Sequence, residues 1–470
     1  RLESVGAFSG HVGGGLGDDS IRVGSGTWSS GALTGGDNAD TISILSGTFS
    51  NFSITGAKGA DSINYAASGA GSSASILAGA GHDTIVIGTG QTAIGITTVF
   101  GGAGNDSITL GSGVSAAVTV AGGGLADTIA VGTAFEGGVI YGDAFGAIAA
   151  GSGTGGTADG DDLIGSTAIG ALLATSVYGA GGADTIQFVS AAAAISINGG
   201  ANADFITVVE ADSALSIQGG NGADTITVSS AASASSVAGG AGHDSLTLNV
   251  SASTLASNLA AGMGTDTVKF LLNAAANATI DGGAQNDIIT STGIGASGTG
   301  SINGGLGADT ISIMSLSGAF SIAGGAGNDT IQITNMTGGV SAGETNIVYG
   351  GAGTDTVQFG GTAGYLIADT AQHISGLSYS ATLQGVINYE SGDVIQLGTS
   401  LAVTTALATD WEDTNNATIY VASSGTKAMN AVMANIGDVA AWSDGTDTYL
   451  VVNTAASTAS SAVVFQVKGA

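Results

Sequence analysis

The chain contains no cysteine and no proline, and it has little positive charge. Without cysteine it has no disulfide bond, no thiolate metal site and no thiol nucleophile. Its 6 Lys and Arg residues stand against 36 Asp and Glu residues, which gives a formal net charge of -30. A field this negative repels phosphate, so we expect neither nucleic acid nor an anionic membrane surface as partner, whereas divalent cations are attracted. No apolar run reaches the roughly 18 residues of a transmembrane helix, so none is predicted.

Glycine, in contrast, is abundant, with 84 of 470 residues, and 43% of the residues are hydrophobic. That hydrophobic share is too high for a disordered acidic tail, so the chain has a core. It begins RLESVGAFSG, without an initiator Met and without the pattern of a signal peptide. From this start we expect a processed or excised part of a longer precursor.

A glycine-rich hexad that ends in aspartate recurs 16 times along the chain. Examples are GGNGAD at residues 219–224 and GGLGAD at residues 304–309. The closing aspartates are on average about 22 residues apart. Internal repetition at this period predicts a solenoid, in which each repeat buries its apolar face only against its neighbours.

The residues around each closing aspartate predict two strands per repeat. The second residue after it is Ile, Leu or Val in all 16 repeats, and the seventh residue before it is aliphatic in 15 of 16. Apolar residues two apart, with Ser or Thr between them, have the period of a strand with one buried face. We therefore predict an all-β fold: a right-handed parallel β-roll or β-solenoid of about 16 two-stranded coils over residues 1–360, and a mostly-β C-terminal capping module over residues 361–470.

Two hexads with their following strands, GGAGNDTIQ at residues 324–332 and GGAGNDSIT at residues 101–109, resemble the nonapeptide of the RTX family of calcium-binding parallel β-rolls. The resemblance implies calcium binding in the hexads, export by type I secretion, an extracellular or cell-surface location, and folding that is coupled to calcium after export. The family has one nonapeptide per half-turn, whereas this chain has one hexad per repeat. We therefore expect a single file of calcium sites along one edge of the roll.

The chemistry of the hexad also favours calcium. Glycine allows positive φ and brings carbonyl oxygens close to an ion, and carboxylate is the hard ligand that Ca²⁺ prefers. Aspartates stacked about 5 Å apart would repel one another by about 3 kcal/mol at an effective dielectric of 20, so a metal-free roll should be destabilised. Up to about 15 ions, one for each gap between turns, would cancel the formal charge. The competing interpretation is a metal-free solenoid whose aspartates only cap turns.

The candidate metal ligands are the sixteen closing aspartates and two further aspartates. They are Asp19, Asp40, Asp61, Asp83, Asp106, Asp127, Asp143, Asp159, Asp162, Asp184, Asp204, Asp224, Asp244, Asp266, Asp287, Asp309, Asp329 and Asp355.

Several repeats depart from the pattern. Asn38 and Asn202 replace the glycine at the fourth hexad position and tolerate a left-handed backbone. Leu125 and Gln285 fit that position less well, which predicts distorted or weakly binding loops in their two hexads.

One spacing lengthens to 35 residues, between Asp127 and Asp162, and predicts an insert loop over about residues 132–161. The insert carries Asp143 and Asp159. It is either folded around an extra calcium ion or simply a solvated acidic loop.

After residue 361 the hexads stop. We predict strands at SYSATLQGVINY (378–389) and GDVIQLG (392–398), a short helix at TKAMNAVMANIG (426–437), and a terminal hairpin of DTYLVVN (447–453) and AVVFQVKG (462–469). This order resembles the C-terminal module of type I-secreted RTX proteins, particularly surface-layer proteins.

We predict no enzymatic activity and no catalytic residues. The segment GVSAG at residues 339–343 fits the G-x-S-x-G pattern of hydrolases but lacks its strand-elbow-helix context. No H-E-x-x-H occurs around the four histidines, so the metalloprotease motif is missing from this chain.

We expect an extracellular calcium-binding structural protein that self-associates into a surface layer, filament or similar cell-surface assembly, with cell-surface polysaccharide as a further candidate partner. Two alternatives stay open. One is an adhesin or interaction stalk. The other is the secretion and folding tail of an RTX enzyme or toxin whose catalytic domain is not in this chain.

Overall fold

The computed structural model describes most of the chain up to residue 361 and scattered strands beyond it. The described residues are 6–24, 26–67, 74–88, 96–111, 114, 118–132, 135, 137–143, 159–172, 175–251, 256–272, 277–295, 298–336, 346–353, 355–361, 364–369, 372–375, 383–388, 396–397, 401–402, 411–412, 418–421, 439–443, 447–453 and 462–468.

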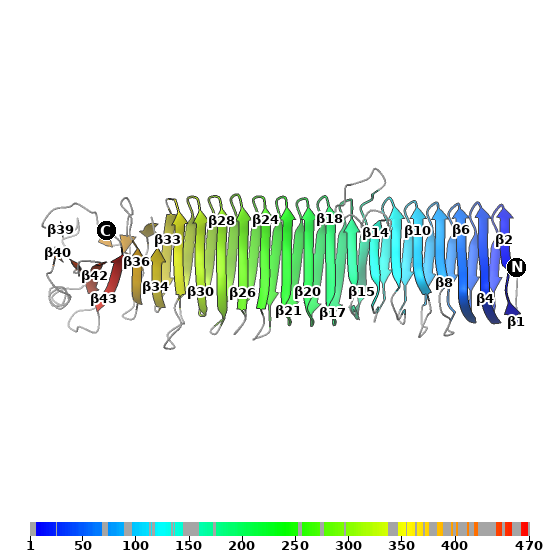
Figure 1. Cartoon of the computed structure of the whole chain (residues 1–470), viewed down its shortest axis with the longest axis horizontal. Coiled ribbons are helices and arrows are strands. Elements are labelled where there is room, and N and C mark those ends of the chain that lie inside the picture. The colour runs from blue at the N-terminus through cyan, green and yellow to red at the C-terminus, as the bar shows by residue number, and fades with distance from the viewer. Residues whose placement is uncertain are drawn as a thin grey trace. The chain divides into compact units, whose positions relative to one another are not determined.

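Secondary structure in these ranges is entirely β. They contain no helix, and therefore none that is long and apolar enough to cross a membrane. The chain divides into two compact units, Arg1–Asp244 (unit 1) and Ser245–Ala470 (unit 2). Both are parallel β-solenoids of two sheets. The strands that precede a hexad form sheet A, and the strands that follow it form sheet B (Figure 1).

Unit 1 stacks its coils in parallel, with register shifts between Ile96 and Thr98 and between Ser166 and Ala171. Its sheet A contains β1 (Gly6–Phe8), β2 (His11–Leu16), β4 (Gly26–Asp37), β6 (Thr48–Lys58), β8 (Ala74–Ala80), β10 (Ile96–Ala103), β12 (Thr119–Gly124), β14 (Val139–Asp143), β16 (Ser176–Ala180), β18 (Ile195–Ala201), β20 (Leu215–Asn221) and β22 (Ser235–Ala241). Its sheet B contains β3 (Ser20–Val23), β5 (Thr41–Ile44), β7 (Ser62–Tyr65), β9 (Thr84–Ile87), β11 (Ser107–Leu110), β13 (Thr128–Val131), β15 (Leu163–Leu172), β17 (Thr185–Ala191), β19 (Phe205–Ala211) and β21 (Thr225–Ala231).

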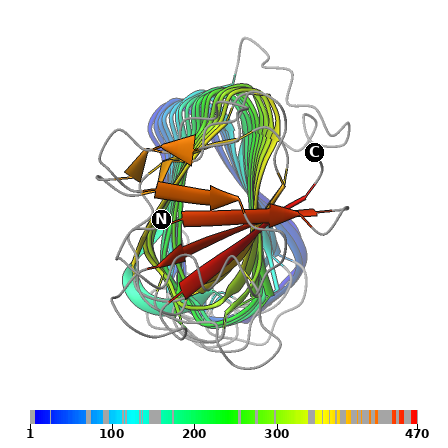
Figure 2. The same ribbon diagram turned by 90° about the vertical axis from the view of Figure 1, so that its left-hand side faces the viewer.

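The register places equivalent repeat positions opposite one another. In sheet A, Ile197 of β18 pairs with Ile217 of β20, and in sheet B, Ile206 of β19 pairs with Ile226 of β21. These aliphatic side chains are at most 1% exposed and fill the space between the two sheets, which Figure 2 shows as the interior of a closed outline. The apolar columns predicted from the sequence are therefore the core of the solenoid.

The first coils of unit 1 hold an aromatic cluster in this core. Trp28, Phe49 and Phe52 are at most 2% exposed, with ring centroids 5.3 to 6.0 Å apart. The Tyr65 ring on the opposite sheet lies 5.7 Å from Phe49. Such pairs stabilise a core by about 0.5–1.5 kcal/mol beyond their buried area, and they join the two sheets here.

Unit 2 repeats the same architecture. Its sheet A contains β24 (Ala256–Met263), β26 (Asn277–Ala284), β28 (Thr299–Leu306), β30 (Ala319–Ala326), β32 (Asn346–Ala352), β34 (Gly364–Asp369) and β36 (Leu383–Asn388). Its sheet B contains β23 (Ser245–Val250), β25 (Thr267–Leu272), β27 (Ile288–Ile294), β29 (Thr310–Leu316), β31 (Thr330–Met336), β33 (Asp355–Gly361) and β35 (Gln372–Ser375). The remaining strands are β37 (Gln396–Leu397), β38 (Leu401–Ala402), β39 (Trp411–Glu412), β40 (Thr418–Val421), β41 (Val439–Ser443), β42 (Asp447–Asn453) and β43 (Ala462–Lys468).

The C-terminal strands change the pairing from parallel to antiparallel. β43 pairs in parallel with β36 and antiparallel with β42, so the hairpin extends sheet A beyond the last coil. The predicted terminal hairpin is confirmed. The helix predicted over residues 426–437 lies outside the described residues, as does the GVSAG segment at 339–343.

The insert predicted over residues 132–161 is shorter than expected. Val139–Asp143 forms β14, which pairs with β12 and β16 within sheet A. β14 ends at Asp143, and the described structure continues at Asp159, which forms a bridge to Leu125.

Candidate functional site: a buried aspartate ladder

Each hexad forms the tight turn from a sheet A strand to the next sheet B strand. Its second and fourth positions have positive φ in every hexad except the one that the insert interrupts. Gly220 and Gly222, for example, have φ values of 119° and 138°. A Cβ atom on Gly220 would lie 2.0 Å from the carbonyl oxygen of Gly200 in the preceding coil. Glycine is favoured because the backbones of neighbouring turns touch at this position.

The non-glycine residues at the fourth position adopt the same conformation. The φ values of Asn38, Leu125, Asn202 and Gln285 lie between 72° and 83°. The aspartates that close the Leu125 and Gln285 hexads keep their ladder hydrogen bonds at 2.7–2.8 Å. The expected distortion of these two hexads is therefore wrong. The reason is that hydrogen bonds to both neighbouring coils offset the roughly 1–2 kcal/mol of left-handed strain.

The closing aspartates point inward, on the same side as the buried aliphatic residues that follow them. All of them except Asp19 are at most 3% exposed. From Asp40 to Asp244 and from Asp287 to Asp355, the Oδ1 atom of each closing aspartate accepts a hydrogen bond from the backbone N–H of the preceding one, as Asp224 does from Asp204 N–H at 2.8 Å. In unit 1 this ladder runs from Asp19 to Asp244, and in unit 2 from Asp266 to Asp355.

The second carboxylate oxygen is the unusual atom of the ladder. Oδ2 is buried without a hydrogen-bond donor in Asp19, Asp40, Asp61, Asp83, Asp106, Asp127, Asp162, Asp184, Asp204, Asp224, Asp287, Asp309 and Asp329. In the hexads of this set that begin with glycine, Oδ2 lies over that glycine. A Cβ atom on Gly199 would be 2.3 Å from Oδ2 of Asp204 and 2.6 Å from the carbonyl oxygen of Gly219. A carboxylate oxygen and a carbonyl oxygen of the next coil thus converge at the turn.

Burial raises the pKa of these carboxyl groups, and neighbouring aspartates raise it further, against the lowering effect of the backbone hydrogen bond. The pKa rises from 3.8 to about 8 in Asp127 and Asp204, to about 9 in Asp162 and to about 7 in Asp287. The ionised form is disfavoured because it is desolvated and lacks a counter-charge. Bound cations would therefore stabilise the ladder when its carboxyl groups are ionised.

The closing aspartates and the backbone carbonyl groups offer oxygen ligands at these turns, which suits calcium or magnesium. Among the described residues, no three His, Cys, Asp or Glu side chains come together as a metal-binding group. A cation at the ladder would therefore draw most of its ligands from backbone carbonyl groups. The buried Oδ2 atoms and the carbonyl oxygens beside them fit that donor set, with the sixteen closing aspartates as the charged ligands.

The insert begins inside a hexad. Gly142 and Asp143 occupy the first two positions, and residues 159–162 complete the turn. Asp143 is 1% exposed, and its carboxylate oxygens accept hydrogen bonds from the backbone N–H groups of Gly181 (2.9 Å) and Gly160 (3.4 Å). The Asp143 carboxylate therefore holds the interrupted turn closed. An extra calcium ion in the insert stays a prediction.

The residue just before the closing aspartate has a role that the sequence reading missed. Asp18, His82, Asp161 and Asn286 each accept a hydrogen bond from the backbone N–H of the equivalent residue in the next coil, at 2.7–3.2 Å. A polar residue at the fifth hexad position is the only sequence signal for this contact. These side chains join successive turns along the outer rim of the hexads.

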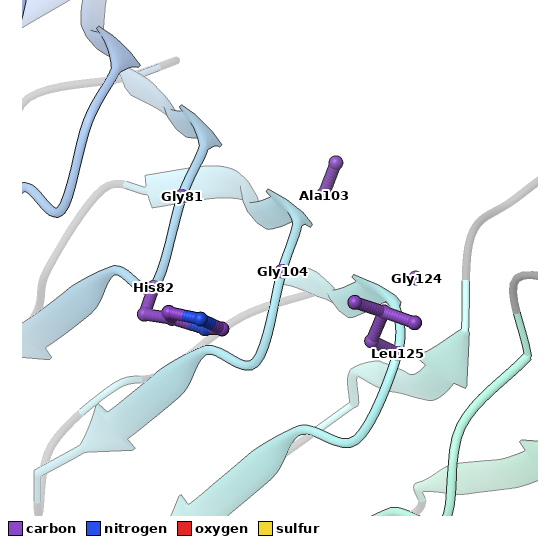
Figure 3. Close-up of a pocket in the computed structure, with 6 residues that line it drawn as sticks. All are labelled: Gly81, His82, Ala103, Gly104, Gly124 and Leu125. Atoms are coloured by element: carbon purple, nitrogen blue, oxygen red, sulfur yellow. The ribbon is translucent and has the colours of Figure 1, made fainter.

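A shallow cavity of about 330 Å³ crosses three turns at this edge of unit 1. In Figure 3 the His82 ring and the Leu125 side chain flank the turn at Gly104. The lining residues are Gly81, His82, Ala103, Gly104, Gly124 and Leu125. His82 is the only one of them with a polar side chain, so the cavity has no converging polar groups to orient a ligand.

Comparison with models of protein families, with curated proteins and with solved structures gave no match. The stacked parallel coils and the repeating aspartate ladder are consistent with an RTX-like β-roll.

Proposed function

We propose that the chain is an extracellular structural protein of RTX type, whose solenoid folds on binding calcium after secretion and self-associates into a surface layer or filament. The observation that carries this proposal is the file of buried carboxylates. In most coils one carboxylate oxygen accepts a backbone N–H and the other has no hydrogen-bond donor.

Turn capping alone explains only half of this arrangement. A cap needs one acceptor oxygen, and Oδ1 fulfils that role in every ladder hydrogen bond. A neutral Asn would offer the same acceptor oxygen and would avoid burying a charge without a partner, which destabilises a protein by several kcal/mol. Repeated use of Asp at this position therefore supports a cation beside the carboxylates.

Calcium, when bound, supplies positive charge between turns and accepts the six to eight oxygen ligands that closely stacked loops can offer. Metal binding then becomes part of the free energy of folding. A chain with a net charge of -30 is less stable where calcium is scarce and more stable where calcium is plentiful. This behaviour suits a protein exported in the unfolded state.

The outward surface of the coils supports self-association. The residue directly after the closing aspartate points away from the core and is Ser or Thr in 13 of 16 repeats. Sheet B therefore presents a surface of mostly small and uncharged side chains, because the closing aspartates point inward. Such surfaces allow copies to pack side by side without burying unpaired charge.

The test is a calcium titration of chelated full-length protein, followed by light scattering and by electron microscopy of the same samples, with magnesium as the control. We expect calcium to compact the chain and then to produce regular filaments or sheets. Compact monomers at every protein concentration would refute the assembly, and the absence of any response would refute the calcium sites.

A further inference from the structure

The outward side of sheet A in unit 1 carries a column of four large side chains, interrupted by Ala121, which is 0% exposed. The register aligns Leu77 with Phe100, Phe100 with Ala121, Ala121 with Tyr141, and Tyr141 with Tyr178. Four strand steps of about 4.8 Å place the ends of this column roughly 19 Å apart. We call these five residues the outward column.

The two tyrosines form the end of the column. Their rings are stacked, with centroids 5.2 Å apart and planes inclined by 16°. Tyr178 has no ring contact other than Tyr141 in the described part of the chain. The register continues from Tyr178 to Asn198 and then to Gln218, which have smaller or more flexible side chains. One face of the Tyr178 ring therefore has no aromatic neighbour. The next two residues along the register on that side are the amides Asn198 and Gln218.

Hydroxyl groups run beside this end of the column. Ser176, Ser196 and Ser216 align on the same three strands, two residues before the tyrosine and the two amides. Ser196, Ser216 and Gln218 are exposed, and Asn198 and Tyr178 are half-buried. The patch thus combines an aromatic face, two amides that each donate and accept hydrogen bonds, and a file of hydroxyl groups.

No charged side chain occurs in either of these two aligned columns between β8 and β20, although the chain as a whole is strongly acidic. The acidic chain repels anionic polymers, and the neutral patch offers no counter-charge to a cationic polymer. A neutral sugar chain matches the patch because its C–H groups pack on an aromatic face while its hydroxyl groups hydrogen-bond to amides and serines.

We propose that Tyr178, Asn198 and Gln218, with the neighbouring serines, form a binding site for a neutral saccharide chain. A sugar ring extends the stack begun by Tyr141 and Tyr178, and the next sugar units lie along the register over the two amides. The site is formed by the outward face of the sheet and does not depend on the proposed calcium ladder or on self-association.

Affinity electrophoresis of the full-length chain tests this site, in gels containing hydroxyethyl cellulose, dextran or galactomannan. Carboxymethyl cellulose serves as the anionic counterpart of the first polymer. The variants are Tyr178→Ala, Tyr178→Phe and, as a matched control at the equivalent exposed position of unit 2, Asn303→Ala. We expect each variant to fold, because the Tyr178 and Asn303 side chains both point away from the core, and circular dichroism checks this.

We expect retardation in a neutral gel and weaker retardation in carboxymethyl cellulose. Tyr178→Ala should weaken binding at least tenfold, equivalent to about 1.4 kcal/mol, whereas Tyr178→Phe and Asn303→Ala should bind like the unchanged chain. Retardation in no neutral gel, stronger retardation in carboxymethyl cellulose, or unchanged binding by Tyr178→Ala would each overturn the proposal. So would a dimer in sedimentation velocity that Tyr178→Ala abolishes, because the face would then bind a second copy.

Discussion

Replacing one ladder aspartate with asparagine should have opposite effects with and without calcium. Asp204 is 2% exposed, its Oδ1 accepts the backbone N–H of Asp184 at 2.8 Å, and its Oδ2 is buried without a donor. Asp204→Asn keeps the shape and the acceptor oxygen but removes the charge. The substitution therefore separates the capping role of the side chain from its role as a metal ligand.

The magnitude follows from the raised pKa. Without metal, the pKa of Asp204 is raised from 3.8 to about 8, mainly by burial. At pH 7 the folded carboxyl group is mostly protonated, and pH 7 lies about 3 units above the unfolded pKa of 3.8. Folding therefore loses about 4 kcal/mol at 1.36 kcal/mol per unit. Asparagine avoids that loss but buries amide N–H groups, which destabilises by about 1–3 kcal/mol. In chelator, we expect Asp204→Asn to stabilise the chain by about 1–3 kcal/mol.

With calcium the sign should reverse. At a calcium concentration 100 times the dissociation constant, one bound ion contributes about 2.7 kcal/mol of stability. About 10 mM calcium reaches that ratio for a site at the tight end of the extracellular range of about 10⁻⁴ to 10⁻³ M. Losing the charged ligand of such a site should destabilise the chain by up to about 3 kcal/mol.

The assay is urea unfolding at pH 7, monitored by far-ultraviolet circular dichroism, in chelator and in about 10 mM calcium. Hydrogen exchange of peptides covering residues 195–231 localises the change, because solenoid coils can unfold individually. The exposed Asp212, changed to Asn, is the matched control and should have little effect in either buffer. If Asp204→Asn shifts stability in the same direction in both buffers, the carboxylate is only a cap, and the reasoning fails.

Three further outcomes test the physical account. In chelator, the chain should lose stability as pH rises from about 4 to 8. The reason is that buried carboxyl groups with raised pKa values are protonated in the folded state but ionised in the unfolded state. A urea midpoint that rises over this pH range would contradict the pKa shifts. Gly220→Val places a β-branched residue at a φ of 119° against a backbone oxygen and should lower the free energy of unfolding by about 2 kcal/mol or more. A Cβ atom on Gly293 would have its nearest neighbour 3.6 Å away, so Gly293→Ala should be nearly neutral in the same unfolding assay. Ile226→Ala removes a fully buried core side chain and should destabilise the chain by about 2–5 kcal/mol. The side chain of Thr227 points outward, so Thr227→Ala should change stability by less than about 0.5 kcal/mol. Equal effects of the two substitutions would contradict the inward and outward assignment.

Much of the fold was accessible from local sequence. Apolar residues at alternate positions after each aspartate predict a strand with one buried face, and Ile226 and Val228 are both fully buried. The glycine pattern predicts the positive φ of the turns. Leu125 and Gln285 show the limit of this reasoning, because their own backbone preferences yield to the hydrogen bonds of neighbouring coils.

The sequence by itself determined that this chain has a repeated strand-turn-strand unit with one aspartate per turn, because strand period and turn glycine are local properties read within a few residues. Only the tertiary structure decided what that aspartate contacts: a backbone N–H of the preceding coil about 21 residues away on one oxygen, and no donor on the other in most coils. It also decided that Tyr141 and Tyr178 are neighbours, although an insert separates them in the chain. Contacts between coils depend on the stacking register, and that register is set by packing of the whole core.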